Sequence, residues 1–251
     1  MFQGFYTLGS TMISQNRNLN VISNNMANAA TTGYKSDQYI SSTFREEMLY
    51  RSGNITPDKR SPIGTTAMIQ ATNARVTNYE QGGLEPTEMP LDLAINGQGF
   101  FVIQKGEDLV YSRNGSFITD DEGYLALPSV GRVMGTNGPI FLETDAVAVD
   151  ANGIIRNEDT GEIYGTLQIV DFEDYAALVK GDNGTFTAGE DAVEQEPVLE
   201  VVQGMLERSN TSMVEEMTSM IAAQRSLQAA AQLIKMYDQL DGKTVNIGSM
   251  S

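Results

Sequence analysis

The stretch FYTLGSTMISQNRNLNVISNNM, residues 5–26, decides how this chain folds. Apolar residues recur in it at steps of three and four, with a glutamine at one position, which is typical of a helix that packs against other helices. The predicted helix spans residues 4–28 and ends at Thr31-Thr32-Gly33, because glycine readily takes the positive φ of a helix-ending turn. The seam of this helix consists of Phe5, Leu8, Met12, Gln15, Leu19, Ile22 and Met26.

The other end of the chain repeats this pattern. A second helix is predicted over residues 212–240, where Ser212-Met213-Val214-Glu215 fits a capping box and Asp241-Gly242 is a stop signal. A glutamine again occupies one seam position, and a buried amide at such a position fixes the register of packed helices. The seam of the second helix consists of Met213, Met217, Met220, Gln224, Leu227, Ala231 and Ile234.

The polar face of the first helix is rich in asparagine instead of the glutamate and lysine of an ordinary surface helix. Asparagine is a mediocre helix former because its side chain competes for nearby backbone groups. The helix therefore gains little from intrinsic propensity, and we expect several neighbouring helices to stabilise it. The asparagines are Asn16, Asn18, Asn20, Asn24, Asn25 and Asn28.

Charge is divided unevenly along the chain. Residues 1–36 carry a net charge of +2 and residues 217–251 carry +1. Because the whole chain has a net charge of −17, residues 37–216 carry −20. The two ends, which carry a small positive charge, are predicted to pack closely, while the acidic middle is predicted to be a solvated body. Because no basic stripe exists to displace phosphate counterions, nucleic acid is excluded as a partner.

Composition narrows the function further. The chain has 251 residues, 41% of them hydrophobic, with no cysteine and no histidine. These absences remove disulfides, thiolate metal sites and the commonest general base, so we predict no enzyme, no metal and no cofactor. No apolar run approaches the roughly 18 to 20 residues of a membrane helix, and no Sec-type signal is expected at the N-terminus.

The middle of the chain divides into a connector, residues 36–85, and a β domain, residues 86–203. The connector is predicted to hold a short helix over residues 43–51 and a Gly/Pro/Thr-rich segment over 53–66. The β domain shows short alternating runs separated by five Asn-Gly dipeptides, which favour tight turns. The predicted fold is α+β: residues 1–35 and 204–251 form a coiled-coil-like helical assembly domain, and an antiparallel β domain is inserted between them.

Three fragments suggest chemistry that we discount. Gly97-Gln98-Gly99 lacks the third glycine and the following helix of a nucleotide site, and Asp150-Ala151-Asn152-Gly153 lacks the glycine and glutamate spacing of a calcium loop. Paired carboxylates of the kind that glycosidases use fall in predicted turns, where solvated loops are the ordinary explanation. The carboxylate pairs are Asp120/Asp121 and Glu158/Asp159.

Motifs in three regions resemble those of the flagellar axial proteins of bacteria, specifically the basal-body rod proteins. The first region is residues 21–35, an asparagine-rich helix followed by a T-x-G-[FY]-K turn; the second is 81–117; the third is 204–225. The motif residues are Asn24, Asn25, Asn28, Thr32, Gly33, Tyr34, Lys35, Gly97, Gly99, Phe100 and Phe101.

The resemblance implies a structural subunit that polymerises helically into a hollow shaft, which transmits torque and lets exported subunits pass. The terminal helices would form the inner tube and the β domain its outside. It further implies export through the flagellar type III apparatus without a cleaved signal peptide, a place in the basal body outside the cytoplasmic membrane, and partnership with copies of itself and other rod and hook proteins. Chain length and the ending Gly248-Ser249-Met250-Ser251 resemble the proximal rod protein, whereas residues 96–101 and 215–217 resemble the distal one equally well; of the two, we expect the proximal rod.

One alternative function uses the same helices differently. A surface adhesin or binding module held as a coiled-coil oligomer would also need two sticky helices, and it predicts a small closed oligomer instead of an open filament. It does not explain why the seams lie at the two extreme ends of the chain.

Overall fold

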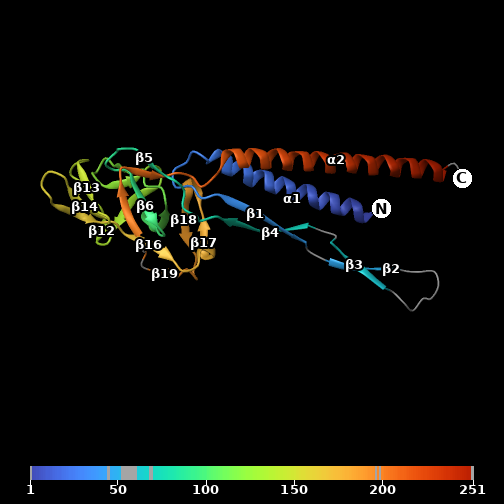
Figure 1. Ribbon diagram of the computed structural model, residues 1–251, viewed down its shortest axis with the longest axis horizontal. Coiled ribbons are helices and arrows are strands. Elements are labelled where there is room, and N and C mark those ends of the chain that lie inside the picture. The colour runs from blue at the N-terminus through green and yellow to red at the C-terminus, as the bar shows by residue number, and fades with distance from the viewer. Residues whose placement is uncertain are drawn as a thin grey trace. The chain divides into compact units, whose positions relative to one another are not determined.

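The computed structural model describes residues 2–43, 46–51, 61–67, 70–195, 197 and 199–249. It contains two compact units (Figure 1). The helical unit comprises Met1–Met26, Asp37–Thr77 and Ser212–Ser251. The β unit comprises Ala27–Ser36 and Asn78–Thr211.

The helical unit contains two helices and two strand pairs. Helix α1 spans Phe2–Ala27 and helix α2 spans Met213–Ser249. Strand β1, Asp37–Thr43, pairs antiparallel with β4, Gln70–Thr77, and β2, Glu46–Arg51, pairs with β3, Ser61–Ala67. The predicted fold class, two terminal helices and a large antiparallel β region, is confirmed.

The two helices run antiparallel, side by side (Figure 1). Near one end, Asn25 donates to the Glu216 carboxylate at 2.8 Å. Near the other, a Cβ added at Gly4 would lie 3.0 Å from the Tyr237 hydroxyl. Helix α1 also packs on β1, where the hydroxyls of Ser14 and Tyr39 lie 3.0 Å apart.

The end predicted for the second helix is wrong. Helix α2 continues through Asp241-Gly242 to Ser249. A glycine inside a helix costs only about 1 kcal/mol relative to alanine, so the turns on either side of Gly242 can override it. The N-terminal stop is as predicted, because α1 ends at Ala27 and Gly33 has φ of +67°.

The helix predicted over residues 43–51 is also wrong, because residues 46–51 form β2. Pairing with β3 supplies backbone hydrogen bonds that a short isolated helix cannot match, and this overrides a weak helical pattern. Of the Gly/Pro/Thr-rich segment, residues 61–66 lie in β3, and 53–60 lie outside the described residues. The domain boundaries named above stay predictions.

The β unit is built from short antiparallel strands. A ten-stranded sheet has the order β17-β18-β8-β7-β11-β10-β9, with β12, β16 and β19 attached. A three-stranded sheet, β13-β14-β15, and the pairs β20-β6 and β21-β5 complete the unit. The strands are β5 Leu84–Pro86, β6 Leu93–Gly97, β7 Phe100–Lys105, β8 Asp108–Ser112, β9 Ile118–Thr119, β10 Leu125–Leu127, β11 Gly131–Gly135, β12 Gly138–Pro139, β13 Val147–Val149, β14 Ile154–Asn157, β15 Ile163–Thr166, β16 Ile169–Phe172, β17 Leu178–Lys180, β18 Thr185–Ala188, β19 Glu194–Gln195, β20 Leu199–Gln203 and β21 Met205–Glu207.

Strand β7 lies between two apolar cores. Phe101 and Ile103 belong to the larger core, whereas Phe100 and Val102 belong to the smaller one. Successive side chains of a strand point to opposite faces, so a continuous apolar run indicates a strand that is buried on both sides. This is why the motif residues Phe100 and Phe101 are both almost fully buried.

The Asn-Gly dipeptides mark turns in most of the predicted places. Asn183 and Gly184 both have positive φ, and Gly97, Gly138 and Gly153 do as well. The segment from Asp150 to Gly153 closes the hairpin between β13 and β14, with the Gly153 amide donating to the Asp150 carbonyl at 2.8 Å. This segment is therefore a hairpin turn.

Candidate assembly faces and their anchor

The predicted seam of α1 lies mostly inside the helical unit. Ile22 is buried, Phe5 is exposed, and the other five seam residues are half-buried. The seam of α2 is divided. Met220, Leu227, Ala231 and Ile234 are half-buried, whereas Met213, Met217 and Gln224 are exposed.

Helix α2 therefore carries an apolar face that its own unit leaves uncovered. Met213, Met217 and Ile221 follow one another at steps of four, with exposed fractions of 47%, 51% and 51%; we call them the methionine face. A second exposed group further along the helix comprises Leu233, Met236 and Leu240. The sequence analysis missed Ile221 and this second group, although their spacing in steps of three and four was the available signal.

Asn25 joins three elements of the helical unit. Its amide nitrogen donates to the Asp37 carbonyl and to the Glu216 carboxylate, both at 2.8 Å, and its oxygen accepts from the Asp37 amide at 2.9 Å. It thus links α1, β1 and α2 through one buried side chain. Of the other motif asparagines, Asn24 is exposed, and Asn28 lies in the turn after α1, where its carbonyl accepts from Thr31.

The T-x-G-Y-K turn is buried in the β unit. The Thr32 hydroxyl donates to the Asn114 side chain at 2.7 Å, and the Gly33 amide donates to the Glu207 carbonyl at 2.7 Å. A Cβ at Gly33 would lie 2.4 Å from the backbone of Arg113, so only glycine fits there. Tyr34 is covered by the Lys180 ammonium, 4.0 Å from its ring centroid.

A buried ionic cluster holds this turn to the end of β21. The Glu207 carboxylate, 1% exposed, accepts from Lys35 at 2.6 Å, from Arg113 at 3.2 Å and from the Gly82 amide at 2.9 Å. Lys35, also 1% exposed, donates in addition to the Glu80 carbonyl at 2.8 Å. Burial lowers the pKa of Lys35 below its usual 10.5, and the Glu207 charge opposes that shift.

The sequence analysis placed Lys35 in a motif but did not single out Arg113 or Glu207 as functional. Two cations and one anion, all nearly inaccessible to water, are costly to bury unless each finds charged or backbone partners. We define Lys35, Arg113 and Glu207 as the anchor. It joins the segment that follows α1 to the segment that precedes α2.

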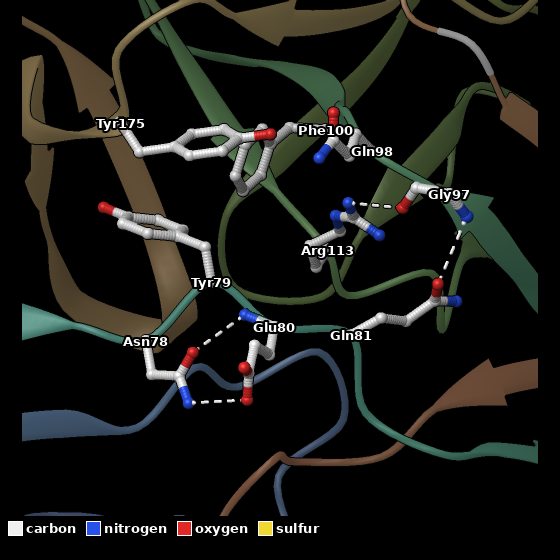
Figure 2. Close-up of a pocket in the computed structure, with 9 residues that line it drawn as sticks. All are labelled: Asn78, Tyr79, Glu80, Gln81, Gly97, Gln98, Phe100, Arg113 and Tyr175. Atoms are coloured by element: carbon white, nitrogen blue, oxygen red, sulfur yellow. Dashed lines mark hydrogen bonds between the residues drawn. The ribbon is translucent and has the colours of Figure 1, made fainter.

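A pocket of about 470 Å³ opens beside the anchor in the β unit (Figure 2). Tyr79 and Tyr175 stack across it with ring centroids 4.8 Å apart, and Arg113 donates to the Gly97 carbonyl at 2.8 Å. The Gln81 side chain accepts from the Gly97 amide at 3.2 Å. The motif residues Gly97 and Gly99 both have positive φ here, which lets this turn come close to Arg113.

In one of the two carboxylate pairs, Asp120 is held by neighbouring hydrogen-bond donors. Asp120 accepts from Arg132 at 2.7 Å and from the Tyr124 amide at 2.8 Å. Slight burial raises the pKa of Asp120, but these hydrogen bonds outweigh it and the pKa is lowered, the opposite of what a general acid needs. Within the described ranges, no cluster of acidic side chains suits a metal ion and no helix is long and apolar enough to cross a membrane.

Three family models match the chain in order. Residues 5–35 match the model described as flagella basal body rod protein, residues 94–157 match the flagellar hook protein FlgE/F/G D1 domain, and residues 202–247 match the flagellar basal body rod FlgEFG protein C-terminal region. The matched ranges contain most of both helices and the anchor residues Lys35, Arg113 and Glu207.

Whole-chain relatives carry corresponding names. A flagellar basal-body rod protein FlgF of Caulobacter vibrioides is 29% identical, covering 98% of this chain and 97% of the relative. A flagellar hook-basal body complex protein FlhO of Bacillus subtilis is 28% identical over 98% of both chains. A flagellar basal-body rod protein FlgG of Agrobacterium fabrum is 31% identical, covering 91% of this chain and 93% of the relative. These relatives give no support to the adhesin alternative, and the chain belongs to the flagellar basal-body rod proteins, as a structural rod subunit of the bacterial flagellum.

Proposed function

We propose that the chain polymerises helically, with copies of itself and with neighbouring rod and hook proteins, into a hollow shaft that transmits torque. The observation that carries this proposal is the methionine face of α2. Three large apolar side chains in one stripe, each about half exposed, lose contact with water when a neighbouring helix covers them. The occupant that we propose is a terminal helix of another subunit.

The asparagine face of α1 supports a further proposal about the channel. Asn16, Asn20 and Asn24 are exposed, whereas Asn25 is buried and acts as a structural link. Exposed amide side chains would offer an uncharged, hydrogen-bonding wall to unfolded cargo. We propose that these three asparagines line the channel and that Gln15 and Gln224 help to fix the register between neighbouring helices.

The route and the position of the subunit are also proposals. The family to which the chain belongs supports export through the flagellar type III apparatus without a cleaved signal peptide, and a final place outside the cytoplasmic membrane. We propose the proximal rod. Electron microscopy of basal bodies that carry a label on this chain tests the position, and a label at the distal end of the rod contradicts it.

A charge placed on the methionine face tests polymerisation. Met217→Asp should reduce incorporation of the chain into rods at least tenfold, because a carboxylate on a covered helix surface must lose its hydration. Ser219→Asp is the matched control, since Ser219 is an exposed polar residue two positions further along α2. Incorporation is measured by isolating basal bodies and quantifying the chain. Equal incorporation of M217D and the original chain contradicts the proposal.

A second experiment, on the purified chain, separates a rod from a closed oligomer. The original chain at high concentration should form filaments or open helical arrays, visible by electron microscopy. A single closed species in sedimentation velocity would favour the adhesin alternative.

A further inference from the structure

The chain passes between the two units four times, at residues 26/27, 36/37, 77/78 and 211/212. Inside the β unit, the ends of three of these passages lie together. The Asn78 amide donates to the Ser36 carbonyl at 2.8 Å, and the Asn210 amide donates to the Tyr34 carbonyl at 3.3 Å. Residues 34–36, 78–80 and 210 therefore form one small crossing point. It adjoins the ionic anchor, because Lys35 and Asn210 both donate to the Glu80 carbonyl.

The Asn210 side chain spans this crossing point. Its oxygen accepts from the Ser36 amide at 2.7 Å. Its nitrogen donates to the Asn78 carbonyl at 2.8 Å and to the Glu80 carbonyl at 3.1 Å. One half-buried amide thus accepts from segment 34–36 with its oxygen and donates to segment 78–80 with its nitrogen.

These bonds require an amide. A carboxylate of the same shape could still accept from Ser36, but its second oxygen would face the two carbonyl oxygens of Asn78 and Glu80, which have no proton to offer. Asn210→Asp therefore turns two attractive contacts into repulsive ones with almost no change in volume. An alanine would leave the Ser36 amide and both carbonyls without this partner.

We infer that Asn210 is a positioning residue for assembly: it holds three of the four passages between the units at one fixed point, so that force carried by the helices enters the β unit there. The inference rests on the proposed polymerisation. It assigns to Asn210 a role that is distinct from the stability of the β sheets, because the Asn210 side chain bonds only to the backbone of crossing segments.

The test compares the same change, asparagine to aspartate, at two positions of the full-length chain, residues 210 and 157. Asn157→Asp is the control, because the Asn157 side chain is also half-buried in the β unit, accepts from the Asp159 and Thr160 amides and donates to the Tyr164 hydroxyl. A carboxylate at residue 157 can keep all three contacts, since the tyrosine hydroxyl can turn to donate. The readouts are near-ultraviolet circular dichroism for the β unit and incorporation into isolated basal bodies.

N210D should keep the near-ultraviolet spectrum of the original chain and lose at least tenfold in incorporation per folded molecule. N157D should lose less than twofold. The backbone amide of Asn78 should exchange its hydrogen faster in N210D than in N157D or the original chain. The reason is that its bond to the Ser36 carbonyl opens more often, while the hydrogen bonds of the sheets are unchanged.

Two outcomes overturn the inference. If N210D is incorporated as well as N157D while M217D is not, Asn210 has no positioning role and the proposed function stands. If N210D unfolds the β unit, its role is structural stability. Normal incorporation of both N210D and M217D would instead refute the proposed polymerisation itself.

Discussion

Glu207 is the residue on which the anchor depends, because its single negative charge faces both Lys35 and Arg113. Removing one partner of a buried ionic group is far more costly than never having buried it, since the remaining charges stay desolvated. The Glu207 carboxylate also accepts from the Gly82 amide, which ties a third segment to it.

Glu207→Gln should lower the free energy of unfolding by about 3 kcal/mol, because two buried cations would then face a neutral amide. Urea unfolding followed by tyrosine fluorescence measures this. Glu85→Gln is the matched control: Glu85 lies 3.5 Å from Arg208, with side chains 60% and 68% exposed, and its loss should cost less than about 1 kcal/mol. Similar losses in the two variants would contradict the importance of burial.

One buried tyrosine, Tyr111, and one half-buried tyrosine, Tyr175, should make the free energy of unfolding depend on alkaline pH. Burial, followed by the hydrogen bond to Glu194, raises the pKa of Tyr111 above its usual 10.0, and burial with the bond to Asp171 does the same for Tyr175. A raised folded pKa gives stability that is fully present below the unfolded pKa and is lost as pH rises above it.

The free energy of unfolding should therefore fall as pH rises above 10.0, since the unfolded tyrosines ionise while Tyr111 and Tyr175 cannot. The double variant Y111F/Y175F should show a shallower fall over that range. Urea titrations at a series of pH values between 8 and about 11.5 test this. If the free energy of unfolding falls equally steeply with pH in the double variant, groups other than these two tyrosines cause the loss of stability at alkaline pH.

At the level of elements, the turn after α1 depends on glycine for two separate reasons. Gly33 has φ of +67°, and a Cβ there would meet the backbone of Arg113 and Asn114 at 2.4 Å. Gly106 has the same φ of +67°, yet among the described residues nothing lies within 4 Å of its would-be Cβ. Comparing alanine substitutions at Gly33 and Gly106 therefore separates the destabilisation due to a positive φ from the destabilisation due to a steric clash of the added Cβ.

Gly106→Ala should lower the free energy of unfolding by about 1 to 2 kcal/mol, the usual cost of a left-handed residue with a Cβ. Gly33→Ala should cost about 3 kcal/mol or more, because backbone atoms must also move apart. Thermal and urea unfolding of the two variants gives the difference. Equal losses would mean that the turn shifts freely and that the close approach is unimportant.

Several elements could be predicted from local sequence, and the errors have local causes. The run of apolar residues around Phe100 predicts a buried strand, and the apolar seam of residues 5–26 predicts α1. Strand β2 was mistaken for a helix because its partner β3 lies in a Thr-rich stretch without a clear apolar pattern. Strands of two or three residues, such as β9 and β12, are too short to show any period.

On the scale of the whole molecule, the net charge of −17 opposes assembly. Subunits packed in a shaft bring their acidic bodies close together, and the repulsion acts over the Debye length. The methionine face contains no charged residue, so its contribution is insensitive to salt.

Self-assembly of the purified chain should therefore increase with salt. Raising ionic strength from about 10 mM to 150 mM shortens the Debye length from roughly 30 Å to about 8 Å, which screens the repulsion between subunits. Sedimentation velocity at several salt concentrations measures the assembled fraction. Less assembly at higher salt would indicate that opposite charges hold the interface instead.

The candidate site shows the limit of prediction from sequence. Periodicity alone predicted the terminal seams, because each helix carries its own pattern. It could not assign Met213 and Met217 to an uncovered face, since this depends on which side of α2 meets α1. The contacts of the anchor could not be predicted from the sequence, because Lys35 and Glu207 are 172 residues apart and no spacing rule joins them.

That separation also determines the order in which the chain can fold. The hydrogen bond of Asn25 cannot form before Glu216, 191 residues later, has been released, and the ion pair of Lys35 cannot form before Glu207 has been released. Closing loops of this length is entropically slow, and contacts distant in sequence are the ones that delay folding most. A chain that emerges N-terminus first from a ribosome or a narrow conduit can form local hairpins at once, but its anchor cannot close until Glu207 is out, nor can the Asn25 link between its helices until Glu216 is out. Completion of the fold is thus timed by release of the segment that contains these two glutamates.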